Sequence, residues 1–346
     1  MERSTKMKKL TALICALLLM LSLAACGESA PTNTPAPAES ADGAAPGETA
    51  DEAEKTYTVG ICQLVQHPAL DAATEGFKAA LTEKLGDRVT FVEQNASGDA
   101  PTCAVICGQF VSDGVDLILA NATPALQAAM SVTADIPILG TSVTDYATAL
   151  DISDWSGVTG KNISGTSDLS PLDGQAEIIG ELFPEAKTVG ILFCSGEPNS
   201  RFQVDVITPM IEALGMSVKE YSFVDSNDIA AVTANACSEC DVIYIPTDNT
   251  AASCTETINS IALNAGIPIV TGEEGLCSGC GVATLSFSYY DLGYTTGEMA
   301  CEVLVDGADV STMPVRSSAK FTKEYNADIC AALGIAPPDG YVAIES

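Results

Sequence analysis

The stretch YTVGICQLVQHPALDAATEGFKAAL, residues 57–81, joins a strand-like segment to a helix-like one. Its first six residues form a run rich in β-branched side chains, which is typical of a buried strand. Further on, apolar residues recur three and four positions apart, so that one apolar stripe runs along a helix: Leu70, Ala73, Phe77, Ala80 and Leu81. A strand followed by an amphipathic helix predicts the first βα unit of an α/β fold.

The same alternation returns along the rest of the chain. Strand-like runs with helix-like stretches between them occupy residues 88–94, 115–120, 136–141, 187–193, 217–223, 241–245, 267–270 and 283–287. Near-continuous apolar strands joined by helices predict doubly wound parallel sheets covered on both faces. Because residues 56–346 exceed what one hydrophobic core usually holds, we expect two lobes.

A break separates the two sets of βα units. Residues 151–175, DISDWSGVTGKNISGTSDLSPLDGQ, are rich in Ser, Gly and Asp and contain no long periodic segment. We interpret them as a crossing between the lobes. Ligands of such sheets bind outside the carboxyl ends of the strands, so two facing lobes would enclose a cleft that closes about a hinge.

The amino-terminal region has the pattern of an export signal. Four basic residues precede the uncharged apolar run 10–23, which is shorter than the roughly 20 residues of a membrane span. The run ends in Leu-Ala-Ala-Cys26, which resembles a bacterial lipobox and implies a signal peptide over 1–25 with lipidation of Cys26. The alternative is an ordinary signal peptide.

Residues 26–55 contain mostly Ala, Pro, Gly, Ser, Thr and acidic residues. Such a composition buries too little apolar surface to offset its ordering entropy and predicts a flexible acidic tether. Lipid, tether and folded body in that order predict a protein anchored at the extracytoplasmic face of the cell membrane.

The chain is strongly acidic, with 46 Asp and Glu against 15 Lys and Arg and a net charge of −31. The acidity argues against nucleic acid as a partner, because phosphate binding requires clustered basic residues. We attribute the acidity to solubility and environmental adaptation, with an electrostatic bias in partner choice as the alternative.

Polar residues follow several predicted strands. Thr123 precedes Pro124, which suits the first turn of a helix, so Thr123 is expected to be the N-cap of a helix whose amino end can bind a carboxylate. Thr141 and Ser142 lie at the end of the next strand and could donate to the same anion. The second lobe offers carboxylates for an ammonium group: Glu197, Asp248 and Glu273. Together these sites would suit an α-amino acid, although such residues are more often caps and turn formers.

Several segments resemble, in order, the family of ABC-transporter substrate-binding proteins that includes tryptophan- and tyrosine-binding lipoproteins. These segments are HPALDAATEGFKAAL, ATPALQAA, SVTDYATAL, NISGTSDLSPL, SGEPNSRFQV, IYIPTDNTAAS and YYDLGYTTGEMACEVL. The similarity extends from about Tyr57 to Ile335. It implies the type I periplasmic-binding-protein fold, two α/β lobes joined by three crossings. The expected N-terminal lobe comprises residues 56–165 and about 288–310, and the C-terminal lobe 166–287 and about 311–346.

The resemblance also implies a function. It points to uptake of a small solute, often an aromatic amino acid, which is passed to a membrane permease and its ATPase. By this likeness, Thr123, Thr141 and Ser142 serve the ligand carboxylate and Asp248 and Asn249 its amino group. The same likeness places Glu197 and Asn199 at the cleft mouth. Tyr146 departs from the family, which usually has proline there, and this leaves ligand preference open.

Two other functions stay open at this point. The protein could signal to a membrane receptor instead of supplying an importer, or it could bind a nucleoside, a sugar or another small solute. Aromatic residues make up only 5% of the chain, which disfavours a sugar site built on stacking rings. We expect a monomer without a cofactor or a metal ion.

The chain contains thirteen cysteines, of which Cys15 lies in the signal and Cys26 is the lipidation site. Two CxxC pairs, Cys237 with Cys240 and Cys277 with Cys280, admit a zinc site or a redox pair. Because these pairs follow different predicted helices and strands, we favour inert thiols over disulfides or metal ligands.

His67 is the only histidine of the chain. Pro68 disfavours helical geometry at residue 67, so His67 should lie at the junction of strand and helix, facing the cleft. We expect it to contact the ligand or to close the cleft. An enzyme is not expected, because there is no G-x-S-x-G elbow or P-loop and the G-x-G at 279–281 lacks a third glycine.

Overall fold

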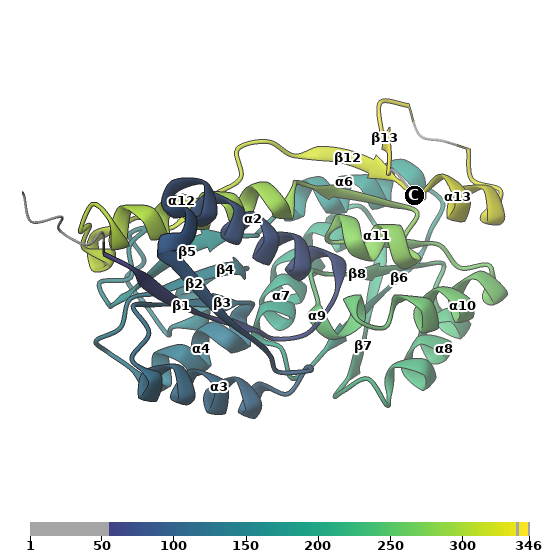
Figure 1. Cartoon of the computed structure of the whole chain (residues 1–346). Coiled ribbons are helices and arrows are strands. Elements are labelled where there is room, and N and C mark those ends of the chain that lie inside the picture. Colours follow the sequence, from purple (N-terminus) through teal and green to yellow (C-terminus); the bar gives the residue numbers. More distant parts are fainter. Residues whose placement is uncertain (1–54, 337–338, 345–346) are drawn as a thin grey trace, which may run out of the picture. The chain divides into compact units, whose positions relative to one another are not determined.

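Two parallel sheets organise the part of the chain that the computed structural model describes, residues 55–336 and 339–344 (Figure 1). These residues belong to one compact unit that begins at Ala53. The predicted signal peptide, Cys26 and nearly all of the tether lie outside the described residues. Among the residues described, no helix is both long and apolar enough to cross a membrane.

The N-terminal lobe contains a six-stranded sheet in the order β11-β5-β4-β3-β1-β2, with all its pairs parallel. Its strands are β1 (Tyr57–Gln63), β2 (Val89–Asn95), β3 (Leu117–Asn121), β4 (Ile138–Val143), β5 (Ile163–Ser167) and β11 (Arg316–Ser317). Its helices are α2 (Pro68–Leu85), α3 (Ala100–Asp113), α4 (Thr123–Val132), α5 (Tyr146–Ala149) and α12 (Tyr289–Leu304), with short 3-10 turns η1 (Gly86–Arg88) and η2 (Val310–Thr312).

Helices cover both faces of this sheet, as its apolar strands require. On one face α3 and α4 bury side chains such as Phe110 and Leu126. On the other face lie α2 and α12 (Figure 1). They bury Phe77 and Met299. Its core is therefore complete without the second lobe.

The C-terminal lobe contains a seven-stranded sheet in the order β13-β12-β10-β9-β8-β6-β7, in which β12 runs antiparallel to β10. Its strands are β6 (Thr188–Cys194), β7 (Ser217–Phe223), β8 (Val242–Ile245), β9 (Ile269–Thr271), β10 (Ala283–Ser286), β12 (Thr322–Tyr325) and β13 (Val342–Ala343). Its helices are α6 (Leu172–Leu182), α7 (Pro198–Ala213), α8 (Ile229–Glu239), α9 (Asn249–Ala252), α10 (Thr255–Ala265), α11 (Glu274–Cys280) and α13 (Ala327–Leu333).

The nine strands expected from apolar runs all form, each within two residues of its predicted start. Sequence patterning missed β5, which lies inside the segment interpreted as a crossing. The strand reads ISGTS, and its hydroxyl groups are buried against other elements. Ser164 Oγ donates to the Met313 carbonyl oxygen at 3.0 Å, and Thr166 Oγ1 lies 2.8 Å from Thr296 Oγ1 on α12. These distant partners make a polar strand stable, and a local pattern does not reveal them.

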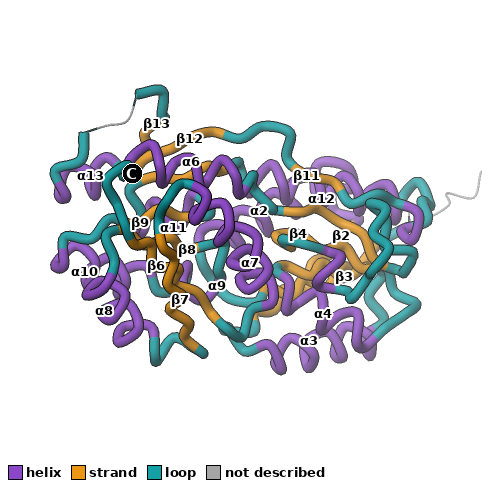
Figure 2. Tube along the Cα trace, turned by 180° about the vertical axis from the view of Figure 1, so that it is seen from behind, coloured by secondary structure: helices purple, strands orange, loops and turns teal. Residues whose placement is uncertain are grey.

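The lobes are joined by three crossings, between β5 and α6, between β10 and α12, and between β11 and β12. Figure 2 shows the last of these, from β11 to β12. The last crossing falls after Ser317, not near residue 311 as expected, because Arg316 pairs with Thr166 of β5 in the N-terminal sheet. Val310 and Met313 are buried in the N-terminal core as well. A two-residue strand has too few apolar positions to be recognised from sequence.

Eleven cysteines lie among the described residues, and all are free thiols. Ten of them are buried, including both CxxC pairs. Burial raises the pKa of the Cys277 and Cys280 thiols, which lowers their reactivity. No group of three or more His, Cys, Asp or Glu residues in the described part is placed to hold a metal ion. The zinc alternative therefore gains no support there, and inert thiols stay our prediction.

Candidate functional site

The carboxyl ends of β3, β4 and β5 lie side by side in the N-terminal sheet and carry buried polar residues. Asn121, Thr123, Ser142 and Asp168 are each at most 5% exposed. Backbone hydrogen bonds join the strand ends: Ala122 N donates to Thr141 O at 3.0 Å, and Asp168 N donates to Val143 O at 3.2 Å. The polar side chains thus form one continuous rim.

Many of these groups have a buried polar atom without a hydrogen-bond partner. Among the described residues, such atoms at or after strand carboxyl ends are His67 Nδ1, Asn121 Oδ1, Thr123 Oγ1, Ser142 Oγ, Asp168 Oδ1, Ser170 Oγ and Asn199 Oδ1. Leaving a buried polar group unsatisfied costs about 1–3 kcal/mol. A cluster of them at a strand edge indicates a site for a small polar ligand.

Two non-glycine residues on this rim have left-handed backbone conformations, Ala122 with φ 93° and Ser142 with φ 54°. Residues held in such sparsely populated regions concentrate at functional sites. Thr123 is the first residue of α4 and not its N-cap, which corrects our expectation; Ala122 holds that position, and no side chain caps the helix. The Thr123 hydroxyl and the amino end of α4 are therefore both available to a ligand.

Thr141 differs from its neighbours because its hydroxyl already has a protein partner. Thr166 Oγ1 donates to Thr141 Oγ1 at 3.2 Å. This bond places Thr141 within the β4–β5 packing, whereas Ser142 carries the unpartnered hydroxyl of the pair.

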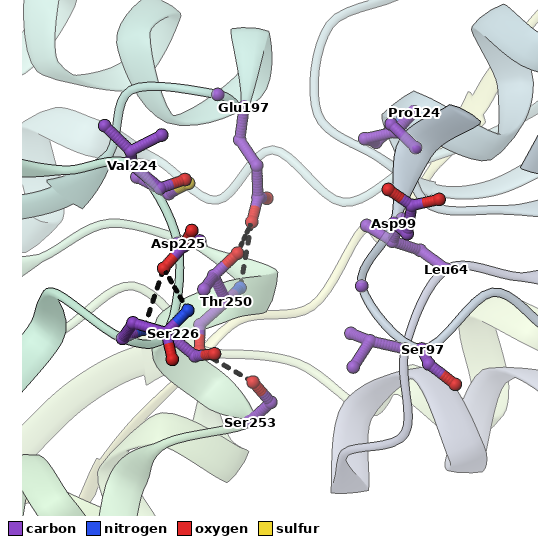
Figure 3. Close-up of a pocket in the computed structure, with 16 residues that line it drawn as sticks. Leu64, Ser97, Asp99, Pro124, Glu197, Val224, Asp225, Ser226, Thr250 and Ser253 are labelled. Carbon is purple, nitrogen blue, oxygen red and sulfur yellow. Dashed lines mark hydrogen bonds between the residues drawn. The ribbon is translucent and has the colours of Figure 1, made fainter. Parts of the chain in front are cut away.

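On the C-terminal side, Glu197 precedes α7 and is 4% exposed. Its Oε2 accepts from Asn249 N at 3.1 Å and from Asn249 Nδ2 at 2.6 Å. Its Oε1 accepts from Thr250 N at 2.8 Å and Thr250 Oγ1 at 2.7 Å, as Figure 3 shows. Asn199 Nδ2 adds a longer bond of 3.2 Å to Oε2. The carboxylate thus ties the loop after β6 to the loop after β8.

Asp248 is 1% exposed and is used in the same way. Its Oδ2 accepts from Cys194 N at 2.6 Å and from Ser200 Oγ at 2.7 Å, and its Oδ1 accepts from Ala251 N at 2.8 Å as the cap of α9. Burial, followed by the negative charge of Glu197, raises the pKa of Asp248 to about 7.

The third predicted carboxylate, Glu273, caps α11. It accepts from the backbone N–H groups of Gly275 and Leu276, both at 2.5 Å. Burial raises its pKa to about 7. All three carboxylates expected to meet an ammonium group are therefore occupied by donors of their own lobe.

His67 bridges the lobes. It occupies the N-cap position of α2 without a side-chain cap bond and is 6% exposed. His67 Nε2 lies 3.3 Å from Asn249 Oδ1. Burial lowers the pKa of His67, so the ring is neutral at pH 7. The tautomer with the proton on Nε2 donates to Asn249 and leaves Nδ1 as an acceptor.

A cavity of about 420 Å³ opens beside this polar cluster and is lined by both lobes (Figure 3). Leu64, Ser97, Asp99 and Pro124 line one side, and Glu197, Val224, Asp225 and Thr250 are among those on the other. Its described lining includes three acidic side chains and no Lys or Arg. The opening is therefore negative and disfavours anionic solutes.

Three residues of the rim were absent from the sequence prediction: Asn121, Asp168 and Ser170. Asp168 and Ser170 directly follow β5, and because that strand was not recognised its carboxyl end was not searched. One feature of the sequence could have indicated them: within residues 151–175, which lack helical periodicity, an aspartate is closely followed by a serine. Asn121 lies one residue beyond the predicted strand 115–120, although it is the last residue of β3.

Two doubly wound lobes, three crossings and a polar cleft at the strand ends together define a two-lobed solute-binding protein of the type I periplasmic-binding-protein fold. A family model described as ABC transporter substrate binding protein matches residues 58–343, and the chain belongs to this family. The resemblance seen in the sequence is confirmed.

Among curated proteins, a tyrosine-binding protein of Clostridioides difficile (strain R20291) is 37% identical over 285 residues, which is 82% of each chain. Among solved structures, a Streptococcus pneumoniae ABC domain in complex with L-Trp has a TM-score of 0.80 at 32% identity, covering 84% of this chain and all of the other. A ligand-free, open substrate-binding protein of Clostridium difficile has a TM-score of 0.64 at 37% identity, with the same coverage.

The lobe arrangement is thus more similar to the L-Trp complex than to the open structure, although the open structure is closer in sequence. The direct contact between His67 and Asn249 agrees with a closed cleft.

Proposed function

We propose that this protein captures an α-amino acid with an aromatic side chain between its lobes and delivers it to an ABC importer. The observation that carries the proposal is the set of buried, unpartnered polar atoms at neighbouring strand ends. Hydroxyl donors and an uncapped helix end suit a carboxylate, and carboxylate and amide oxygens suit an ammonium group. An α-amino acid presents both charges within a few ångströms.

The aromatic side chain is inferred from relatives, and the apolar surface of the neighbouring cavity is compatible with it. One relative is named a tyrosine-binding protein, and a structural neighbour was solved with L-Trp. The cavity of about 420 Å³ lies beside the polar rim, and its lining does not include Thr123, Ser142 or Asp168. Leu64, Val65, Pro124 and Val224 give its lining apolar surface.

The partners follow from the family. The protein would act without catalysis, as a monomer, and would release its ligand to a membrane permease driven by an ATPase. A lipid on Cys26 would hold it at the outer face of the membrane, with residues 27–55 as the tether. Replacing Cys26 with Ser should move the protein from the membrane fraction to the soluble fraction, and its retention in the membrane would contradict the anchor.

Thermal unfolding of the purified protein against the twenty amino acids, nucleosides and sugars tests the ligand. A ligand at 100 times its Kd adds about 2.7 kcal/mol of stability, which raises Tm by several degrees for a chain of this size. A rise confined to tyrosine, tryptophan or phenylalanine would support the proposal. A rise only with nucleosides or sugars would contradict it. If no compound raises Tm, mass spectrometry of the denatured protein will reveal whether a ligand was already bound.

A further inference from the structure

The carboxylates that face the cleft differ in how many hydrogen bonds they already accept. Those of Glu197, Asp248 and Glu273 are occupied by donors of the C-terminal lobe on both oxygens. Asp168 is 2% exposed, and its Oδ1 has no partner among the described residues. No described Lys, Arg or His forms an ion pair with it. Of these four carboxylates, Asp168 is the one that keeps an unused buried oxygen.

The other half of Asp168 is held firmly. Tyr289 Oη donates to Asp168 Oδ2 at 3.0 Å, and the Asp168 backbone N–H donates to Val143 O at 3.2 Å. Tyr289 begins α12 at the second crossing, and Asp168 follows β5 at the first crossing. Burial raises the pKa of the Asp168 carboxyl, and the Thr144 side chain lies near enough to oppose this rise. The carboxylate is thus held through Oδ2 by Tyr289, while its Oδ1 accepts no hydrogen bond from the described residues.

Groups suited to a carboxylate lie on the same lobe. Thr123 Oγ1 and Ser142 Oγ are buried and unpartnered, and α4 begins at Thr123 without a side-chain cap. Because β3, β4 and β5 are neighbours in the sheet, these donors and Asp168 occupy three adjacent strand ends. On the C-terminal side of the site, the buried atom without a partner among the residues described is Asn199 Oδ1, an oxygen of a neutral amide.

We propose that the N-terminal lobe alone binds both charged groups of the amino acid, with Asp168 accepting the ammonium group and Thr123, Ser142 and the amino end of α4 donating to the carboxylate. The C-terminal lobe then contacts the side chain of the amino acid and selects among side chains. This inference rests on the proposed function and replaces the expected division, in which the ammonium group would meet Asp248 on the other lobe.

The test compares L-tyrosine with 3-(4-hydroxyphenyl)propanoate, which lacks the amino group, by isothermal titration calorimetry. Losing one partner of a buried charge pair costs at least about 30-fold in affinity. We expect Asp168→Asn to weaken L-tyrosine binding by at least about 30-fold and to leave the deaminated analogue nearly unchanged. Equal loss for both compounds, or no loss for either, would overturn the proposal.

Two further variants separate the alternatives. Asp116→Asn is the matched control, because Asp116 accepts from Thr58 N at 2.8 Å at the opposite end of the same sheet and should leave both affinities unchanged. Asp248→Asn should change both affinities by a similar factor, since Asp248 braces the loops of its lobe. If Asp248→Asn removes the preference for L-tyrosine over the analogue, the ammonium group binds there and the proposal is wrong.

A complementary measurement does not depend on the folding of Asp168→Asn. Tyramine keeps the ammonium group and lacks the carboxylate, so the double variant Thr123→Val, Ser142→Ala should lose affinity for L-tyrosine by about 10-fold or more and bind tyramine as the parent does. A parallel loss for tyramine would contradict the assignment of these hydroxyls to the carboxylate.

The outcomes distinguish this inference from the proposed function. If the parent protein binds a non-aromatic α-amino acid instead of tyrosine, the aromatic ligand is wrong, and the same comparison proceeds with that amino acid and its deaminated analogue. If it binds no α-amino acid, both proposals are overturned.

Discussion

On the C-terminal side of the cleft, the carboxylates of Glu197 and Asp248 accept hydrogen bonds from backbone and side-chain donors of their own lobe. On the N-terminal side, Thr123, Ser142 and Asp168 are as deeply buried, yet each has a polar atom without a partner. Burial is similar on the two sides, and what differs is the number of protein partners.

The difference separates two uses of a buried polar group. A satisfied carboxylate between two loops stabilises the fold, and its removal leaves several donors unpaired. An unsatisfied hydroxyl or carboxylate costs stability in the unliganded protein and recovers that cost when a ligand pairs with it. Substitutions on the two sides should therefore have opposite signatures in stability and in binding.

The largest effect on stability is expected for Glu197→Ala. The substitution leaves Asn249 N, Asn249 Nδ2 and Thr250 N without their acceptor, at a cost of about 3–5 kcal/mol. Urea unfolding followed by circular dichroism measures the loss. Glu256→Ala in the exposed first turn of α10 is the control and should change stability by less than about 0.5 kcal/mol. A loss below about 1 kcal/mol would show that Glu197 does not brace these loops.

Stability should fall as the pH rises toward neutrality. Burial raises the pKa of Asp168 to about 6 and those of Asp248 and Glu273 to about 7. Between about pH 4.5 and these values, the folded protein keeps protons that the unfolded chain has released, so raising the pH favours unfolding. The slope is at most about 1.4 kcal/mol per pH unit for each such proton, and the decline levels off about one pH unit above the folded-state pKa values.

Urea unfolding at pH 5, 6, 7 and 8 tests this expectation, and Glu273→Gln should reduce the slope by removing one titrating group. Because the chain carries a net charge of −31, repulsion among its many negative charges also lowers stability at higher pH. A single substitution would change this general repulsion very little. An unchanged slope in Glu273→Gln would place the titration elsewhere.

On the N-terminal side, Thr123→Val should separate binding from stability. The variant removes a buried hydroxyl without a partner, so the free energy of unfolding should stay within about 0.5 kcal/mol or rise. Affinity for the amino acid should fall about 10-fold, equivalent to 1.4 kcal/mol. Urea unfolding and calorimetry on the same preparation check both numbers. If Thr123→Val were destabilised and its affinity unchanged, Thr123 would serve the fold and not the ligand, contrary to the expectation for the N-terminal side.

The smallest effect is expected at the contact between the lobes. His67→Ala removes the 3.3 Å contact with Asn249 Oδ1, and a hydrogen bond of this kind contributes about 1 kcal/mol. We expect a loss of affinity of about fivefold, mainly through faster dissociation, because the contact forms when the cleft closes. Stopped-flow kinetics resolves this. Unchanged affinity and dissociation would remove His67 from the closing mechanism.

Much of the fold was predictable because it depends on local pattern. The run 57–62 and the stripe from Leu70 to Leu81 identify a strand and a helix without reference to the rest of the chain. Nine strands and the cleft between two lobes followed from the same reasoning. The positions of His67, Thr123 and Ser142 near strand ends followed as well, because each lies within five residues of the end of a recognisable apolar run.

Tertiary contacts determine the strands that the pattern of apolar residues in the sequence does not reveal. The polar strand β5 forms because it pairs with the two-residue strand β11 and contacts α12, and both partners lie more than a hundred positions away in the sequence. Asp168 was missed for that reason.

The sequence by itself determined the βα order, the two lobes and the family of solute-binding proteins, since the spacing of apolar residues and the motif segments are properties of the chain alone. It also showed that Asp248 and Glu197 follow strands. Only the tertiary structure decided that these carboxylates are satisfied and that Asp168 is not, because hydrogen-bond donors are supplied by distant segments that meet once the chain has folded.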